Sequence, residues 1–423
     1  MAPGSSEIHA VRQRIPHASW WCVVSTVLMA GALGFNFAVI DPTQKPIGLW
    51  SNFIDLRVYW LAGRLLDAGH SLYDGGIIGQ LPFTYPPFAG ILFWGLADTD
   101  FQTLCYWWEG ISVLLLAVVI GMVLRERGYR VDGYTCYLAV SLAVGAVFLD
   151  PIRTTLVFGQ INIILMLLVA IGFLRKGDHW GAGIGIGLAA GIKLTPGFFV
   201  IVLAIQRRWR TLATSVLAFA ATIACGFWVL PADSHTYWLH SMLHNNRVGS
   251  YLNRADQSLQ AVVYRMAGGP TPWWIAVELV GVILILATLW YAAYLRNNTL
   301  MMALGGLGAC LLSPFSWNHH YVWIVPILLV MVDALVNHWV AHSGWVRAWI
   351  VCGIAGVVGT TATWMAEIVP HKKGPLVGAP LVTMYSYPYL FWQGIYVFMT
   401  LAVFVGVLVY SRARYTSQQT ISC

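Results

Sequence analysis

The sequence predicts an all-α polytopic membrane protein, a bundle of about 12 transmembrane helices, and two observations lead to this fold class. The first is composition, because 58% of the 423 residues are apolar, only 10% are charged, and the mean hydropathy is +0.69. Soluble proteins are nearer half apolar and a quarter charged, so lipid must solvate much of this surface. The second is length, since about 12 spans of ~20 residues use roughly 240 residues. A soluble enzyme, a disordered chain and a disulfide-stapled secreted module are excluded.

The predicted spans follow the apolar segments in chain order. The first, residues 20–40, is long enough to be a retained helix, and no cleavable signal peptide is expected. Residues 86–97 begin with two prolines and are too short to cross a bilayer, which predicts a re-entrant or interfacial segment. The 12 apolar segments are 20–40, 101–124, 134–149, 156–174, 180–192, 196–206, 210–230, 272–295, 299–315, 320–336, 345–368 and 388–411.

Basic residues predict the orientation of these spans. Of the 24 Lys and Arg residues, 14 lie beside span ends on one side and nine lie on the other, while Lys193 falls between two apolar segments. Cytoplasmic loops carry the excess of positive charge, so both termini are predicted to be cytoplasmic, in a multi-pass plasma-membrane protein. Residues 41–85 and 231–271 then form two outer, periplasmic loops within a single domain over 1–423. The net charge of +7 indicates membrane lipids, not nucleic acid, as partners.

An amphipathic helix is predicted over residues 54–67 of the first outer loop. Its apolar residues recur at helical spacing, which is typical of a helix lying on the outer leaflet. Asp55 falls in the first turn, where a carboxylate commonly offsets the helix dipole. The apolar stripe consists of Ile54, Val58, Leu61 and Leu65.

Polar residues collect near the predicted outer ends of several spans. Gln160 and Asn162 open an apolar segment, where they either form hydrogen bonds between helices or line a cavity. His319 and His320 follow a helix-breaking proline, and adjacent histidines suit one metal ion poorly, so we expect them to be donors to an anion. The seven cysteines lack metal-site spacing and are expected to be packing residues. No metal site is predicted.

Two short apolar segments, 180–192 and 196–206, meet at Lys193. Two short helices are predicted there, with a tip at or below the outer surface, because irregular backbone at that depth needs protein or a wet cavity around it. Gly183, Gly187 and Gly191 are spaced four apart, as in helices that pack closely. This pattern favours packing over a phosphate-binding loop.

Five short motifs, taken in their order along the chain, resemble those of the integral-membrane C-type glycosyltransferases that use lipid-phosphate sugars. Within them, the chain is similar to the actinobacterial polyprenyl-phosphate-mannose-dependent mannosyltransferases of family 87, over most of its length. One departure is Asp256-Gln257-Ser258, where an Asn-Gln-Ser-like string is expected, which leaves the role of residue 256 open. The motifs that carry the resemblance are Asp55, Tyr85-Pro86-Pro87, Gly159-Gln160-Ile161-Asn162, Lys193-Leu194-Thr195-Pro196 and His319-His320.

The resemblance implies a C-type bundle that transfers mannose from polyprenyl-phosphate mannose to a phosphatidylinositol mannoside. It implies an α-1,2 linkage, formed with inversion on the periplasmic face, and no required cofactor. A single displacement needs one general base, for which Asp55 is the candidate. Tyr85, Gln160 and Asn162 are expected to line the cavity. The candidates to bind the donor phosphate are His319, His320, Lys193, Arg153, Arg247 and Arg254.

A lipid or solute transporter, such as a flippase, is the main alternative, since it too would have many spans and broken helices. No internal repeat supports it, and the charged residues gather at the outer face instead of the midplane. A non-catalytic scaffold would explain the spans but not the outer Asp, His and Arg residues.

Overall fold

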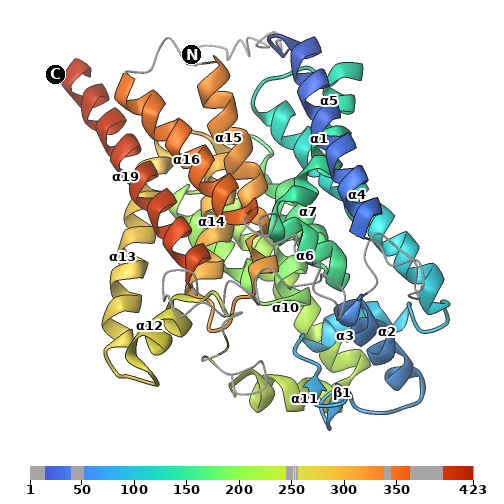
Figure 1. The fold of residues 1–423 in the computed structure, drawn as a ribbon. Helices are drawn as coiled ribbons and strands as arrows, with labels where there is room; N and C mark the ends of the chain where they lie inside the picture. The colour runs from blue at the N-terminus through green and yellow to red at the C-terminus, as the bar shows by residue number, and fades with distance from the viewer. Residues whose placement is uncertain are drawn as a thin grey trace, which may run out of the picture.

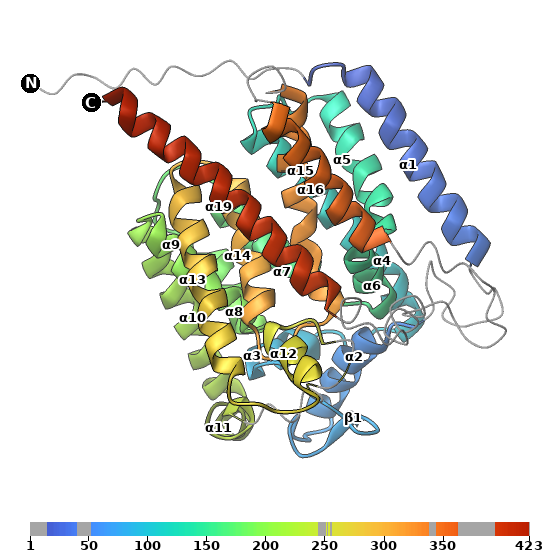
Figure 2. The same ribbon diagram turned by 60° about the vertical axis from the view of Figure 1, so that its left-hand side comes forward.

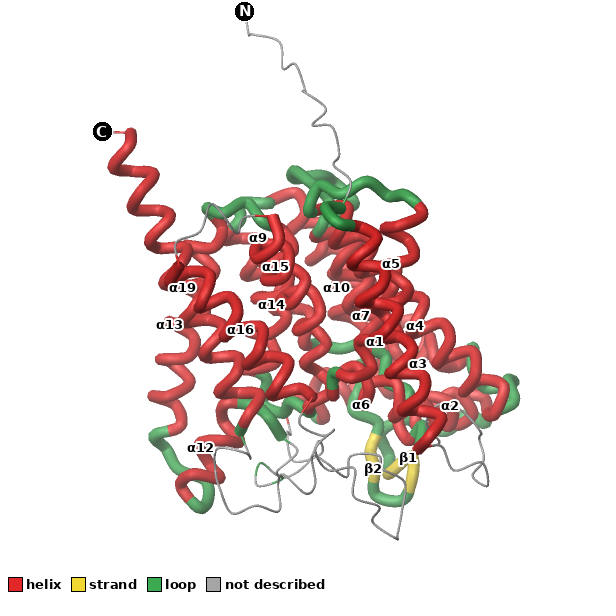
Figure 3. Tube along the Cα trace, turned by 45° about the horizontal axis from the view of Figure 1, so that its top comes forward, coloured by secondary structure: helices red, strands yellow, loops and turns green. Residues whose placement is uncertain are grey.

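The computed structural model describes residues 15–39, 52–243, 251, 253, 256–337, 344–362 and 394–422. Within these residues the protein is a helical bundle with one small hairpin, in which strands β1 and β2 pair antiparallel (Figure 3). Up to residue 192 the elements are α1 (Ala18–Val39), α2 (Ile54–Asp67), β1 (Gly76–Ile78), β2 (Leu81–Pro82), α3 (Pro87–Trp94), α4 (Phe101–Glu126), α5 (Gly133–Gly145), η1 (Ala146–Phe148), α6 (Asp150–Phe158), α7 (Asn162–Phe173) and α8 (Ile184–Ile192).

The second half of the chain completes the bundle. Helix α1 begins and α19 ends at one end of the molecule, whereas α2, α3, α11 and α12 lie at the other, which we call the α2 end (Figures 1 and 2). The elements are η2 (Thr195–Phe198), α9 (Phe199–Ile205), α10 (Trp209–Val229), α11 (Pro231–Leu239), η3 (Ser241–Leu243), α12 (Leu259–Ala267), α13 (Trp274–Ala293), α14 (Asn298–Leu312), η5 (Asn318–Trp323), α15 (Ile324–Asn337), α16 (Gly344–Ala362) and α19 (Ile395–Ser422).

The structure supports a multi-pass membrane protein but not the predicted count of 12 spans. Six helices among the described residues are long and apolar enough to cross a bilayer: α4, α10, α13, η5 with α15, α16 and α19. A seventh is possible if α5–η1 and α6, which are bent by 88°, form one span. Large apolar side chains lie exposed on these helices, including Trp228 at 85% and Trp345 at 81%. Such surfaces are suited to lipid.

One stretch differs from the prediction. The apolar segments 134–149 and 156–174 predict two spans with residues 150–155 between them as an outer loop, but α6 begins at Asp150 and the helix breaks before α7. Pro151 suits the first helical turn, because it lacks an N–H that would be unsatisfied there anyway. Gly159, with φ of 65°, ends α6 in the left-handed conformation typical of helix C-termini. Parts of the predicted segments 345–368 and 388–411 lie outside the described residues.

Helix α2 has the predicted bounds, but a different face of it is buried. Ile54, Leu61 and Leu65 of the predicted stripe are only half-buried. Helix α2 packs against α3, α4 and α6, and these neighbours, not the sequence periodicity, select the buried face. Helix α3 has eight residues and is about 12 Å long, so it is too short to cross, as expected. The fully buried residues of α2 are Leu56, Tyr59 and Ala62.

The two short helices predicted in residues 180–206 are present. Helix α8 ends at Ile192, Lys193 adopts an extended conformation, and η2 starts at Thr195. Gly187 and Gly191 of α8 face α10: a Cβ on Gly187 would collide with Ser215, and one on Gly191 would collide with Thr222. They are therefore packing residues that allow the two helix backbones to approach closely.

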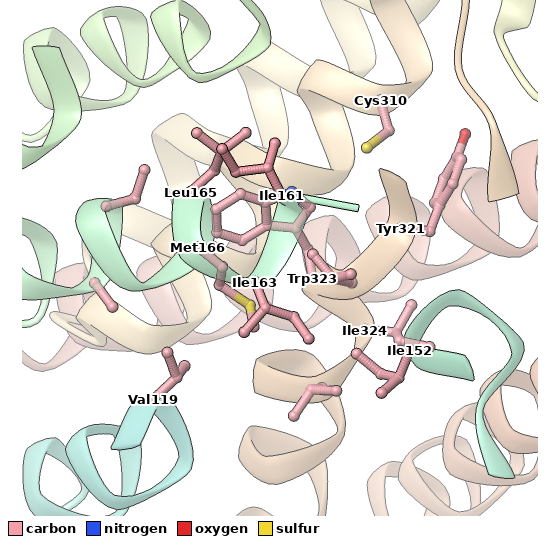
Figure 4. Close-up of a cluster of buried hydrophobic side chains, with 14 of the residues drawn as sticks. Val119, Ile152, Ile161, Ile163, Leu165, Met166, Cys310, Tyr321, Trp323 and Ile324 are labelled. Atoms are coloured by element: carbon pink, nitrogen blue, oxygen red, sulfur yellow. The ribbon is translucent and has the colours of Figure 1, made fainter. Parts of the chain in front are cut away.

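The core lies where α7, α14 and η5 meet. Ile163 and Met166 of α7 are fully buried next to Trp323 and Ile324 at the junction of η5 and α15 (Figure 4). This junction continues into the turn that carries the two histidines, so the packing of the core fixes where that turn lies.

Candidate functional site

Four interruptions in helical structure meet toward the α2 end: the start of α2, the loop between α6 and α7, the break after α8, and η5. The first two are joined directly, because the backbone N–H of Phe53 donates to the carbonyl of Val157 at 2.8 Å. Phe53 is buried in the left-handed region, with φ of 45°, which costs a non-glycine residue about 1–3 kcal/mol. A Cβ on Gly159 would lie 2.6 Å from the Cβ of Leu56. Close packing therefore holds Asp55 beside the loop after α6.

Asp55 has the environment of a candidate base. Its carboxylate is partly buried, accepts a hydrogen bond from the side chain of Gln160 and interacts electrostatically with Lys193. Burial raises the pKa of Asp55 to about 6, while the Gln160 hydrogen bond and the Lys193 charge oppose that rise. A carboxylate with such a pKa is ionised at neutral pH and more basic than an exposed aspartate.

Two tyrosines fix the orientation of Gln160. The hydroxyls of Tyr59 and Tyr85 lie 2.7 Å apart, and they lie 3.1 and 3.3 Å from Gln160 Oε1. Each hydroxyl has one proton, so one tyrosine donates to the other, which donates to Gln160 Oε1. With its oxygen engaged in this way, Gln160 turns its amide NH₂ toward Asp55. The sequence left open whether Gln160 forms hydrogen bonds between helices or lines a cavity, and the structure shows the hydrogen bonds. Tyr59 was missed, although its i+4 spacing from Asp55 places the two on one helix face.

Lys193 is the central cation of the site. Its Nζ lies 3.2 Å from Asn162 Oδ1 and 3.0 Å from His320 Nε2, and 5.6 Å from the centre of the Tyr85 ring. The Nδ2 of Asn162 donates to the carbonyl of His319 at 2.9 Å, so Asn162 ties the histidine turn to α7. A cavity of about 20 Å³ beside Lys193, Asn162 and His320 has room for one water molecule.

The ring of His320 has a defined proton position. Its Nδ1 accepts the backbone N–H of Trp317 at 3.2 Å, so in the neutral ring the proton is on Nε2. The Nε2–H then points at Lys193 Nζ, 3.0 Å away, and donates to it when the amine is neutral. An anionic oxygen placed beside both groups would accept from the Nε2–H and from the protonated amine. The pair is therefore a candidate anion site.

His319 lies in an aromatic enclosure next to this pair. It is 3% exposed, stacks on Trp317 at 6.0 Å and meets the edge of Phe158 at 5.7 Å between ring centroids. Neither ring nitrogen has a hydrogen-bond partner among the described residues. Both predicted histidines are thus at the site, and His320 is the one in contact with Lys193.

Of the three predicted arginines, the structure describes Arg153. Arg153 is buried on α6, where it interacts electrostatically with Asp150 one turn earlier. Arg247 and Arg254 lie outside the described residues. Within the described part of the chain, no three His, Cys, Asp or Glu side chains are close enough together to hold a metal ion.

A groove of about 450 Å³ runs beside the site between α3, α8 and α10. Helix α8 ends directly before Lys193 and α3 begins two residues after Tyr85, and these two residues are in contact. The groove and the cationic part of the site therefore border the same two helices, α3 and α8, although Tyr85 and Lys193 do not line the groove. Its lining is apolar apart from two threonines: Phe88, Ile184, Leu188, Thr214, Leu217, Ala218, Ala221 and Thr222.

Comparison with individual proteins and comparison with protein families identify the same group of enzymes. The chain is 28% identical to the polyprenol-phosphate-mannose-dependent alpha-(1-2)-phosphatidylinositol mannoside mannosyltransferase of Mycobacterium tuberculosis, over 97% of this chain and 96% of that protein. It is 30% identical to the corresponding phosphatidylinositol pentamannoside mannosyltransferase of the same species, over 83% and 80%. An alpha-(1->3)-arabinofuranosyltransferase of Corynebacterium glutamicum is 26% identical over 63% of this chain. No solved structure gives a significant match.

The family comparison agrees with these relatives. Residues 83–314 match the sequence model of glycosyltransferase family 87. This segment includes Tyr85, Gln160, Asn162 and Lys193. Asp55 and the histidine pair flank the matched segment on either side, and the fold brings them to the same site. Because the match covers more than half of the chain, the protein belongs to glycosyltransferase family 87.

Proposed function

We propose that this enzyme transfers mannose from polyprenyl-phosphate mannose to a phosphatidylinositol mannoside, with inversion and an α-1,2 linkage, on the periplasmic face of the membrane. The names of the relatives support the donor and acceptor classes. The observation that carries the proposal is the placement of Asp55 in the electrostatic field of Lys193, next to His320. Membership of a glycosyltransferase family sets aside the transporter and scaffold alternatives.

In the proposed reaction, an acceptor hydroxyl oxygen attacks the anomeric carbon of mannose on the face opposite the phosphate. The bond from that carbon to the phosphate oxygen breaks, and polyprenyl phosphate leaves with the electron pair. Asp55 accepts the hydroxyl proton, which contributes about 10²–10⁴-fold. Lys193 and His320 Nε2–H donate to the phosphate oxygen on which charge develops, and donors placed in advance stabilise such charge.

The groove between α3, α8 and α10 is the proposed site of the donor's polyprenyl tail. Its lining is almost entirely apolar and its exposed rim includes Leu217 at 63% and Ile184 at 49%, so it opens toward surrounding lipid. One of its walls ends at Lys193, the proposed phosphate ligand. A lipid phosphate with its headgroup at Lys193 would therefore lay its first isoprene units along the groove.

Purified protein in lipid nanodiscs tests the proposed function. With radiolabelled polyprenyl-phosphate mannose and phosphatidylinositol mannosides of defined size, label should pass to a larger mannolipid with a new α-1,2 linkage. Asp67→Asn, on the exposed end of α2, should remain active and serves as the matched control for variants of Asp55. Absence of transfer to every mannoside by folded protein would contradict the proposed substrates.

A further inference from the structure

A short backbone pairing outside the site fixes the turn that carries the histidines. Asp256 pairs with Trp317 in an isolated antiparallel bridge, and Gln257 N–H donates to the Ser316 carbonyl at 2.6 Å. Further along, the Tyr321 hydroxyl donates to the Gln257 carbonyl at 2.6 Å. This pairing therefore holds the histidine turn at both of its ends.

The side chain of Asp256 reinforces the pairing. Its Oδ1 accepts the backbone N–H of Ser316 at 3.0 Å and that of Ser258 at 2.9 Å. Asp256, Ser258 and Ser316 are all fully buried. Losing the Oδ1 acceptor would leave two buried N–H groups without a partner, and each such group costs about 1–3 kcal/mol. The carboxylate therefore determines the conformation at Ser316, the residue before Trp317.

The conformation at Trp317 in turn sets the chemistry of His320. The Trp317 N–H occupies His320 Nδ1, which leaves the ring proton on Nε2 facing Lys193. If the backbone at Ser316 and Trp317 turned, this N–H would no longer hold the ring. The pairing reaches the site through the backbone, since Asp256 Oδ1 accepts the backbone N–H groups of Ser258 and Ser316, while the Arg265 guanidinium donates to the Asp256 carbonyl at 2.7 Å.

We propose that Asp256 is a positioning residue, which fixes the Ser316–His320 turn so that His320 Nε2–H points at the donor phosphate beside Lys193. This inference rests on the proposed function of His320 and Lys193. Only one of its two carboxylate oxygens is used, because Oδ2 has no hydrogen-bond partner among the described residues. Arg265 interacts electrostatically with the carboxylate, but it also donates to the backbone carbonyls of Asn253 and Asp256. An amide oxygen in the place of Oδ1 would therefore keep both N–H partners and leave the backbone hydrogen bonds of Arg265 in place.

A double-mutant cycle between Asp256 and His320 tests the inference. Asp256→Ala should lower turnover about 10- to 100-fold, the effect of misplacing a reacting group by about 1 Å. In a His320→Ala background it should have no further effect beyond about twofold, because the group that it positions is already absent. Fully additive effects of the two substitutions would overturn the proposal. If His320→Ala alone keeps normal turnover, the proposed role of His320 is what fails.

Two further variants separate positioning from general destabilisation. Asp178→Ala removes a carboxylate that also accepts two backbone N–H groups, from Arg210 at 2.9 Å and Thr211 at 2.8 Å. These residues lie at the start of α10, at the end of that helix away from α11. Its effect should be small and additive with His320→Ala. Asp256→Asn retains the acceptor and should keep near-normal turnover and the same dependence on pH. Loss of turnover in folded Asp256→Asn would overturn the proposal even if Asp256→Ala did not fold.

Discussion

At the scale of single residues, the site combines one partly buried carboxylate with one cation and two histidines. Among the described residues, no second carboxylate is a hydrogen-bond or electrostatic partner of Asp55. Asp256 is also a buried acid, but its Oδ1 accepts the backbone N–H groups of Ser258 and of Ser316 in the histidine turn. These different partners are the reason why we propose different roles for the two aspartates, where the sequence left the role of Asp256 open.

Asp55→Asn should reduce turnover at least ~10²-fold while the protein still folds and binds donor. Asparagine accepts hydrogen bonds as aspartate does and caps helices well, but it cannot take the acceptor proton. Turnover and donor binding should be measured separately, with Asp67→Asn as the control. A fully active Asp55→Asn enzyme would remove Asp55 from the mechanism.

The pH dependence of turnover should show an acidic limb near the pKa of Asp55, about 6. The base acts only when ionised, and protonation increases as the pH falls through its pKa, so activity should be lost toward lower pH and level off above it. The profile of kcat/KM for the acceptor checks this. Activity that stays flat down to about pH 4, where an ordinary aspartate titrates, contradicts the assignment.

His320→Ala should lower turnover by about 10²–10³-fold, the usual loss when one donor to a developing negative charge is removed. Lys193→Gln should raise the KM for the donor as well, because it also removes the positive charge that attracts the phosphate. Steady-state kinetics over a range of donor concentrations distinguish the two effects. Near-normal constants for both variants would place the phosphate elsewhere.

At the scale of elements, interrupted helices build the site. Each break has a local cause: Gly159 ends α6, Lys193 and Leu194 separate α8 from η2, and Ser313 to Trp317 separate α14 from η5. The breaks free backbone and side-chain polar groups at the ends of apolar helices, which is tolerated only where protein surrounds them or a cavity contains water. Broken helices at one end of a bundle are therefore expected at a polar site for a lipid substrate.

Ala221→Trp tests the groove at this scale. Ala221 lines the groove, so a tryptophan there should obstruct the polyprenyl chain and raise the KM for a long-chain donor, with little effect on a short-chain analogue. Ala220→Trp is the matched control, because Ala220 is exposed on the same helix but does not line the groove. Equal effects of the two substitutions would contradict a tail site between α3, α8 and α10.

At the scale of the whole molecule, the two ends of the bundle differ in character. The α2 end holds the amphipathic helix, the hairpin and the approach to the site, while α1 begins and α19 ends at the opposite end (Figure 1). The basic residues near the start of α1 and along the last turns of α19 support a cytoplasmic location for that opposite end. We therefore propose that the site faces the periplasm.

Cysteine labelling checks this orientation. Asp74 near the hairpin and Ser417 on α19 are both exposed, so each can be replaced by cysteine in a background where the exposed Cys136 and Cys352 are serine. A membrane-impermeant maleimide applied to intact cells should label Asp74→Cys, and Ser417→Cys should react only after lysis. Labelling of both positions in intact cells contradicts the predicted topology.

The sequence by itself determined the class of the protein and most of its helices. Apolar segments of span length appear in the structure as helices, because a chain in lipid must satisfy its backbone hydrogen bonds within each segment. The bounds of α2 and the break at Lys193 were predicted from apolar spacing and from the proline at position 196, which are local signals. The motif order also led to Asp55, Lys193 and the histidine pair.

Only the tertiary structure decided how these residues act together. The buried face of α2 and the contributions of Tyr59 and Asp256 depend on neighbours far away in the chain. Lys193 and His320, for example, are 127 positions apart, and Asn162 and His319 are 157 apart. A sequence pattern reports the preferences of adjacent residues, whereas burial, proton position and hydrogen-bond partners are set by packing between distant segments.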